Sequence, residues 1–399
     1  MYFILILFFF DQIKSQKIAF GSCYNYEDPE SLIFFEIAKH KPDTFVWLGD
    51  AAYVTSKTNQ NRRMSELNET IIEYKFNLTK YNPGYQKLLN ATQINGIWDD
   101  HDYNERDGIY SNPVKEMTRQ LFLNFLDVKI DDERRFKKDG IYYSFKLKNT
   151  KIILLDVRWN RNPEQQDVLG QNQWIWLENE LQDNEVDLFI IGSGSQILPN
   201  DRLFIDVWYL SSRNKLLSIL KGKNVLLMTG DVHFAEILQD PCTNIIEVCS
   251  SGLSYGSHYR NILRGLFEFF AEIFQPDTYS QYYERFADKN YAIIDIDEKK
   301  ISIYNESSLL YQVDFNKTTS IKCEDLESTP LIFKYFWNFK DKLNAFFSML
   351  LFYQIVKALK LCIILLVLII LCVFGILKFF GLSIIIKRKT NEKIKQKNE

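Results

Sequence analysis

Four short apolar stretches of the sequence each end in residues whose side chains can bind metal ions or move protons. In α/β sheets, ligands gather outside the carboxyl ends of the strands, so four such ends can meet at one site. The clusters that follow the stretches are Gly21-Ser22-Cys23, Gly49-Asp50-Ala51-Ala52-Tyr53, Asp99-Asp100-His101-Asp102 and Gly230-Asp231-Val232-His233.

The third of these clusters predicts a bound cation. Its three carboxylates would repel one another strongly in a dry site, and a metal ion or solvent removes that repulsion. The chain has only four histidines, and two of them, His101 and His233, lie in the clusters. A coordinated metal would also hold Cys23 as a thiolate.

Each residue of the clusters has a structural alternative when it is taken alone. Cys23 would serve as a small buried apolar residue, and Tyr53 as a core residue whose hydroxyl finds a partner. Asp50 would cap a helix, and His233 would lie in the core. The shared strand-end position of all four clusters favours a metal site over these alternatives.

The elements that position the clusters alternate between strands and helices, which predicts an α/β core with hairpin-like strands near 291–313. Helices are indicated over 170–182 and 206–220. Asp28-Pro29 and Asn112-Pro113 each resemble an N-cap followed by proline at the first helical position. The apolar runs typical of strands are 17–21, 44–48, 94–98, 141–147, 151–156, 187–192, 224–229, 244–248, 291–296 and 300–304.

The composition excludes several classes of protein. With 399 residues, 46% of them hydrophobic and 25% charged, the chain is globular rather than disordered, collagen-like or coiled-coil. A net charge of −3 argues against a nucleic-acid-binding surface. Six cysteines are too few for a disulfide scaffold. A bridge among Cys242, Cys249 and Cys323 would leave one thiol over.

The two ends of the chain predict passage through the secretory pathway. Residues 1–15 begin with ten apolar residues and are expected to be a signal peptide; a buried N-terminal strand is the alternative. The apolar run from Leu361 to Leu377 resumes after Lys378, so 358–386 is expected to be a transmembrane helix. Residues 331–357, rich in aromatic residues, are expected to be an amphipathic segment at the membrane surface; a second, short membrane segment is the alternative.

The tail 387–399 carries six basic and two acidic residues. Basic residues beside a span stay on the cytoplasmic side, so the bulk of the chain is expected outside or in the lumen, as a single-pass type I protein. Lysines three and five residues from the end, Lys397 and Lys395, resemble a signal for retrieval to the endoplasmic reticulum; a solvated tail is the alternative. Five glycosylation sequons, all before the span, agree with this topology. They begin at Asn68, Asn77, Asn90, Asn305 and Asn316.

The clusters and their flanking residues resemble the alkaline phosphatase D (PhoD-like) branch of the calcineurin-like metallophosphoesterases, over residues 17–315. The resemblance implies a four-layer α/β/β/α sandwich for the domain 16–330. Two departures are Asp102, where many members have Glu, and Asp206-Val207-Trp208, an altered form of a family segment. The matching stretches are IAFGSC, FVWLGDAAY, WDDHDYN, LLDVR, LGQNQWIWLENEL, IIGSGSQIL, LLMTGDVHFAEI and EVCSSGLS.

Residue by residue, the resemblance implies a centre of two metal ions bridged by Asp50. Cys23, Tyr53 and His233 would complete a first site that suits ferric iron. Asp100 and Asp231 would bind a second ion, calcium or another divalent metal.

The resemblance also assigns residues around the metals. His101 would contact the substrate or protonate the leaving group. Arg158 would clamp a phosphate oxygen, and a structural ion pair with an aspartate is its alternative. The residues expected to support the ligands from behind are Asp99, Asp102 and Gln196.

The expected function is hydrolysis of phosphate mono- or diesters by water that two metals activate. A phosphodiesterase acting on lipid or glycolipid head groups and a catalytically silent binding ectodomain are the alternatives. The segments 54–93 and 254–290 are expected to be loops that shape specificity. The sequence leaves open the oligomeric state.

Overall fold

The structure, a computed structural model, describes residues 15–26, 31–55, 66–199, 208–240, 242–254 and 285–316. The chain divides into two units, Met1–Ser328 and Thr329–Glu399, and all described residues belong to the first. Residues 1–14 of the expected signal peptide, and the whole of the juxtamembrane segment, the transmembrane helix and the basic tail, lie outside these ranges. Among the described residues, no helix has the length and apolar character needed to cross a membrane.

The first sheet is mixed, with the order β12-β11-β10-β1-β2-β3. Its parallel half carries the first three polar clusters at its strand ends, and its other half is an antiparallel meander that pairs with β1. The strands are β1 (Lys17–Gly21), β2 (Thr44–Leu48), β3 (Gln93–Ile97), β10 (Tyr291–Asp295), β11 (Lys300–Tyr304) and β12 (Leu309–Asp314).

The second sheet is also mixed, with the order β4-β5-β6-β7-β9-β8. Its four central strands are parallel, and β4 and β8 pair antiparallel at its edges. The strands are β4 (Tyr143–Leu147), β5 (Thr150–Leu155), β6 (Leu188–Ser193), β7 (Val225–Thr229), β8 (Ala235–Gln239) and β9 (Ile246–Ser250).

Six helices and one 3-10 turn belong to the described part of the chain. The helices are α1 (Ile33–Lys39), α2 (Glu69–Lys80), α3 (Pro83–Leu89), α4 (Lys115–Phe125), α5 (Gly170–Glu180) and α6 (Leu210–Leu220), and the 3-10 turn is Glu133–Arg135.

Alternating side chains of the strands build a layered core. In β2, Trp47 packs with its ring centroid 5.7 Å from that of Phe34 in α1 and 5.6 Å from that of Tyr85 in α3. The neighbouring Leu48 instead points toward Gly192 of the second sheet. Sheet strands therefore bury one face against helices and the other against the opposite sheet.

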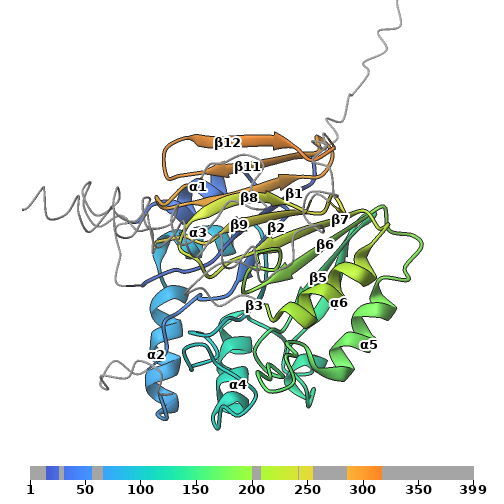
Figure 1. Cartoon of the computed structure of the whole chain (residues 1–399). Coiled ribbons are helices and arrows are strands. Elements are labelled where there is room, and N and C mark those ends of the chain that lie inside the picture. The colour runs from blue at the N-terminus through green and yellow to red at the C-terminus, as the bar shows by residue number, and fades with distance from the viewer. Residues whose placement is uncertain are drawn as a thin grey trace, which may run out of the picture. The chain divides into compact units, whose positions relative to one another are not determined.

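The outer face of the second sheet is covered by α5 and α6, which lie beside β5 and β6 in Figure 1. Trp174 and Leu177 of α5 and Leu216 of α6 share one apolar cluster with Ile153 and Ile191 of the strands. The expected α/β sandwich is confirmed as two mixed sheets with helices against their outer faces.

Several expectations about single elements need correction. The segment 54–93 is not a loop, because α2 and α3 occupy most of what the structure describes of it. The Asn112-Pro113 pair does not begin a helix: α4 starts at Lys115, and the Asn112 Oδ1 accepts the Val114 N–H at 2.9 Å.

Strand β8 was not predicted at all. In its sequence AEILQ, the polar residues Glu236 and Gln239 are fully buried. The strand therefore lacks the continuous apolar run from which buried strands are predicted.

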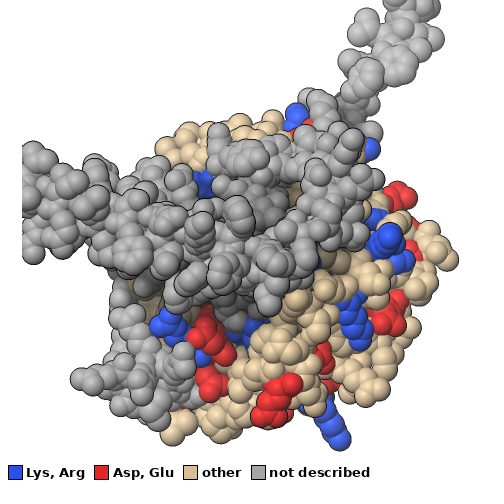
Figure 2. Space-filling model, in the orientation of Figure 1, with Lys and Arg blue, Asp and Glu red and all other residues tan. Residues whose placement is uncertain are grey.

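Over the described part of the face drawn in Figure 2, Lys and Arg side chains lie interspersed with Asp and Glu.

Substitution of Asn82 by alanine is expected to lower the free energy of unfolding by about 1–2 kcal/mol. The Asn82 Oδ1 accepts the first free N–H groups of α3, and its Nδ2 donates to the buried hydroxyl of Tyr24, next to Cys23. Asn90→Ala at the other end of α3 is the matched control, because Asn90 is exposed and, among the described residues, its side chain donates only to the Gln86 carbonyl. Equal losses in urea unfolding of the two variants would contradict this account.

Candidate metal centre

The four polar clusters converge because the two sheets approach closely at their strand ends. Gly49 has φ +87°, and a Cβ there would lie 2.2 Å from the Asp99 Cβ. A Cβ on Gly230 would lie 2.4 Å from the Ser22 Oγ and 2.6 Å from the Leu48 carbonyl oxygen. Only glycine permits these contacts, and they bring the ends of β1, β2, β3 and β7 together.

Four of the predicted ligands have a left-handed backbone, which is uncommon for residues other than glycine. The φ angles are 60° at Cys23, 52° at Asp50, 78° at Asp231 and 61° at His233. Such conformations cost on the order of 1–3 kcal/mol each and cluster at functional sites. The turns after β1, β2 and β7 therefore carry strain at the residues that bear candidate ligands.

Three sets of side chains place candidate ligand atoms within 4.8 Å of one another. One set is Cys23, Asp50 and His233, and a second is Asp50, Asp100 and His101. Asp100 also belongs to the third set, with Asp99 and Asp231. Asp50 takes part in two of the sets, so its carboxylate is shared by two candidate groups of ligand atoms.

The first set is held together by hydrogen bonds around Cys23. Its Sγ lies 3.5 Å from the Asp50 Oδ2 and 3.2 Å from the Ser251 Oγ. The same Ser251 hydroxyl oxygen accepts the backbone N–H of His233 at 2.8 Å. The hydroxyl of Tyr53 lies 3.3 Å from the His233 Nε2, which completes the predicted group of first-site ligands.

His101 lies at the open side of the cluster, where 21% of its side chain is exposed. Its backbone N–H donates to the Asp50 Oδ1 at 3.3 Å, and its ring centroid is 4.2 Å from that of Tyr53. Its Nδ1 is 3.4 Å from the Thr55 Oγ1, and its Nε2 is 3.9 Å from the Asp100 Oδ1. The imidazole can therefore reach both the carboxylates and an incoming ligand.

Asp99 lies behind the open side and pairs with Arg158. The Arg158 Nε donates to the Asp99 Oδ1 at 2.5 Å, and both side chains are almost completely buried. For Arg158 the sequence left open a phosphate clamp and a structural ion pair, and the ion pair is the contact present here. Asp156 accepts the backbone N–H of Arg158 at 3.0 Å and so fixes the segment that carries it.

Asp102 joins the loops that follow β2 and β3. Its Oδ1 accepts the N–H of Ala52 at 2.9 Å, and its Oδ2 accepts those of Ala51 at 3.2 Å and Asp99 at 3.4 Å. Burial raises the pKa of its carboxyl group to about 8. Asp102 thus holds the neighbours of Asp50 in place, as a residue behind the ligands should.

Burial makes the cluster costly to charge without a cation. It is the main cause that raises the pKa of Asp50, and the nearby carboxylates of Asp100 and Asp99 raise it further. Burial also raises the pKa of the Cys23 thiol, again assisted by Asp50. It lowers the pKa of His233 to about 4, so this imidazole is neutral and able to bind a metal near neutral pH.

The donor set fits two hard or borderline cations. The Asp100 Oδ1 is buried and has no hydrogen-bond partner among the described residues, although the Asp107 N–H donates to its Oδ2 at 2.9 Å. The Cys23 thiol, the Tyr53 hydroxyl, an imidazole and carboxylates surround the Asp50 position, and carboxylates gather at the far side. Positive charge at these two places would reduce the repulsion between the carboxylates and give the Asp100 Oδ1 a partner.

Gln196 lies apart from the ligand sets. Its Nε2 donates to the Glu236 Oε1 at 2.7 Å, and Arg285 donates to the other oxygen of Glu236 at 3.1 Å. This buried network supports the loop after β6. Its support of the metal ligands stays a prediction.

The cysteines outside the centre are also accounted for in part. Cys242 is disulfide-bonded, with its partner outside the described residues. Cys249 is buried in β9, and its thiol forms no disulfide bond.

Two functional residues escaped the sequence analysis. Ser251 contacts Cys23 and His233 together, and Thr55 contacts His101. Ser251 lies in the stretch EVCSSGLS, which resembles the family, but the resemblance assigns no role to its serines. Serine and threonine are too common for their types alone to indicate such a role.

A comparison with known families identifies the family to which the chain belongs. The PhoD-like phosphatase family matches residues 18–303, most of the chain and all four clusters. The chain belongs to the PhoD-like phosphatase family. It is therefore a phosphoesterase, a hydrolase with a metallophosphoesterase fold, and the expected resemblance is confirmed.

Solved structures agree on the fold of this PhoD-like phosphatase. A structure of PhoD superposes with a TM-score of 0.58 at 16% identity, covering 84% of this chain and 78% of that one. The purple acid phosphatase PPD1 of yellow lupin, Lupinus luteus, gives a TM-score of 0.50 at 12% identity, covering 79% of this chain and 57% of that one. Among curated proteins, none matches the sequence significantly.

Asp102→Asn is expected to reduce the metal content and the activity of the phosphatase while the chain still folds. The amide would direct a donor at backbone N–H groups that now face an acceptor, which costs about 1–3 kcal/mol. Elemental analysis and phosphate release measure the effect. Asp131→Asn, at an exposed turn, is the control and should match the wild type. Full metal content and activity in Asp102→Asn would refute the positioning role of this residue.

Proposed function

We propose that the protein hydrolyses a phosphate ester at a centre of two metal ions that share Asp50. The observation that supports this most directly is the membership of Asp50 in two ligand sets, on a strained left-handed turn. In this assignment, Cys23, Tyr53 and His233 complete one site, and Asp100 and Asp231 complete the other. Two bound cations supply charge neutralisation and water activation for phosphate esters.

Two further residues move a proton and hold a carboxylate of the centre. His101 is the partly exposed imidazole of the centre, and burial lowers its pKa. A neutral imidazole can accept the proton of a water molecule or, once charged, give a proton to the leaving oxygen. We assign Arg158 to holding Asp99, because its guanidinium is buried against that carboxylate.

The donor types support ferric iron at the first site. A phenolate oxygen and a thiolate sulfur both suit an oxidised, highly charged metal. At the second site the carboxylates favour calcium or another divalent ion. The silent binding ectodomain is disfavoured, since a module without chemistry has no use for so many buried ligand types in one place.

Asp50→Ala and His101→Ala are expected to separate metal binding from proton transfer. Loss of the shared carboxylate should remove both metals and abolish turnover. Loss of His101 should leave the metals bound and lower turnover by about 10²–10⁴-fold, the usual range for a positioned acid or base. Metal content by elemental analysis and phosphate release are measured together. Turnover in Asp50→Ala would overturn the site assignment, and metal loss in His101→Ala would make that residue a ligand.

Tyr53→Phe is expected to abolish a visible absorption band without unfolding the protein. A phenolate bound to ferric iron absorbs visible light by charge transfer, and phenylalanine has no oxygen to donate. The Tyr53 hydroxyl faces His233 in the first set, so its removal is local. Tyr81→Phe, at an exposed tyrosine, is the control. An unchanged spectrum, or a wild-type protein without iron, would contradict the ferric assignment.

We further propose that this phosphatase is a single-pass type I membrane glycoprotein of the endoplasmic reticulum or cell surface, with the catalytic domain lumenal or extracellular. The apolar run 361–377 and the basic tail after it support this topology. Of the sequon asparagines, Asn68, Asn90 and Asn316 are exposed, and Asn77 and Asn305 are half-buried. A lipid or glycolipid head group as substrate would suit a domain held beside a bilayer.

A further inference from the structure

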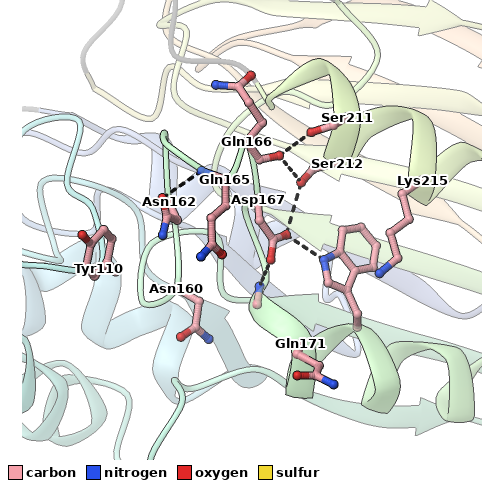
Figure 3. Close-up of a pocket in the computed structure, with 12 residues that line it drawn as sticks. Tyr110, Asn160, Asn162, Gln165, Gln166, Asp167, Gln171, Ser211, Ser212 and Lys215 are labelled. Carbon is pink, nitrogen blue, oxygen red and sulfur yellow. Dashed lines mark hydrogen bonds between the residues drawn. The ribbon is translucent and has the colours of Figure 1, made fainter.

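A cavity of about 520 Å³ lies between the loop 160–167 and the first turns of α5 and α6. Figure 3 shows its lining side chains, with Tyr110 on the side away from the helices. Because α5 follows β5 and α6 follows β6, their first turns lie at the edge where these parallel strands end. Arg158, which pairs with Asp99 of the metal centre, also follows β5 and precedes Asn160 of the cavity by two residues. The cavity therefore lies at the same strand-end edge of the second sheet as the turn after β7, which carries Asp231 and His233.

The lining of the cavity is polar and rich in carboxamides. Among the described residues that line it there is no aliphatic side chain. A carboxamide offers both a donor and an acceptor, as does each hydroxyl of a sugar. The carboxamides are Asn160, Asn162, Gln165, Gln166 and Gln171, and the hydroxyl groups are those of Tyr110, Ser211 and Ser212.

Several of these groups retain hydrogen-bonding capacity within the described structure. Asn160 donates through Nδ2 to two carbonyl oxygens, each at 3.1 Å, which leaves its Oδ1 for a donor. Asn162 accepts two backbone N–H groups through Oδ1, which leaves its Nδ2 for an acceptor. The side chains of Gln165 and Gln171 make no hydrogen bond with any described residue. The cavity thus presents donors and acceptors together.

The wall of the cavity is held in place before any ligand arrives. Asp167 accepts the Trp174 Nε1–H at 2.8 Å, the Gly170 N–H at 3.1 Å and the Ser212 hydroxyl at 3.3 Å, which ties α5 to α6. Asn162 and Asp167 exchange two backbone hydrogen bonds, which close the loop that carries Gln165. A preformed polar cavity lowers the entropic cost of binding.

The charges of the lining favour a neutral ligand group over a free anion. Lys215 is the one cationic side chain among the lining residues that the structure describes, and its Nζ lies 4.3 Å from the Trp174 ring centroid. Asp167 balances it in the same wall. A second phosphate would find no excess of positive charge here.

We propose that this cavity binds a carbohydrate group of the substrate, so that the phosphatase acts on a phosphate ester that carries a sugar or a cyclic polyol. The link to catalysis rests on the proposed function, whereas the binding of sugar by the cavity does not. The neutral, hydroxyl-rich group occupies the cavity, and the phosphate lies at the metal centre on the same sheet edge.

The test compares the full-length chain on phenyl phosphate and on a panel of glucose, mannose, galactose and myo-inositol monophosphates. At least one panel ester should exceed phenyl phosphate in kcat/KM. The ratio to follow is kcat/KM for that ester divided by kcat/KM for phenyl phosphate. The double variant Gln165→Ala/Gln171→Ala should lower this ratio by about threefold to tenfold for each side chain, because each loses a neutral hydrogen bond to the substrate. Asn172→Ala, exposed beside Gln171 but outside the lining, is the matched control and should keep the ratio. A ratio that the double variant leaves unchanged would overturn the proposal.

Failure of the proposed function gives a different result. If no ester is hydrolysed, the free sugars and inositol are titrated into the wild type and the double variant by saturation-transfer NMR. Binding by the wild type that the double variant loses would support the cavity as a carbohydrate site on its own. No binding, or equal binding by both proteins, would overturn it.

Discussion

Mutual repulsion among buried acidic side chains is the constraint on which the rest of this structure depends. The pKa of Asp50 is raised by burial and by its carboxylate neighbours, so the cluster resists carrying its full charge alone. The protein supplies two partial remedies of its own, the guanidinium of Arg158 on Asp99 and backbone N–H groups on Asp102. Neither reaches the centre of the cluster at Asp50. Cations bound at that centre would complete the electrostatics, and two such cations would also activate water toward a phosphate ester. The five carboxylates are Asp50, Asp99, Asp100, Asp102 and Asp231.

The fold holds these acidic side chains together with left-handed turns and close contacts that are unfavourable by themselves. Left-handed turns at four ligands cost energy, which the surrounding sheets must offset through their buried apolar residues. Gly49 and Gly230 allow backbone and side chains of neighbouring loops to approach within distances that a Cβ would prevent. Ser251 then fixes Cys23 and His233 relative to each other from the far side. Strain, close approach and hydrogen bonds together prepare the ligand positions in advance, which is how preorganised sites avoid rearrangement during a reaction.

Local chemistry explains which parts of this arrangement the sequence could predict. Strands with continuous apolar runs, such as β2 and β7, are visible because they are buried on both faces. Strand β8 was missed since Glu236 is buried there with Gln196 and Arg285, partners far away in the chain. The helices α2 and α3 were missed because their apolar stripes are narrow, with only Ile72 and Phe76 as large buried hydrophobic residues in α2. The ligand types could be predicted from motifs, but the contact of Arg158 with Asp99 depends on the pairing of two sheets.

The division of labour among the loops bears on how such a protein acquires its substrate. The candidate metal ligands come from the loops after β1, β2, β3 and β7, where strain and close packing leave little freedom to vary. The polar cavity is lined mainly by the β5–α5 connection from Asn160 to Asp167 and by residues of α5 and α6. The segment from Asp156 to Asn160 joins the two regions, since it anchors Arg158 at one end and lines the cavity at the other. Recognition can therefore change between Asn160 and Asp167 and in the first turns of α5 and α6 without disturbing the carboxylates, because segments on a rigid sheet edge tolerate substitution better than the strained turns do.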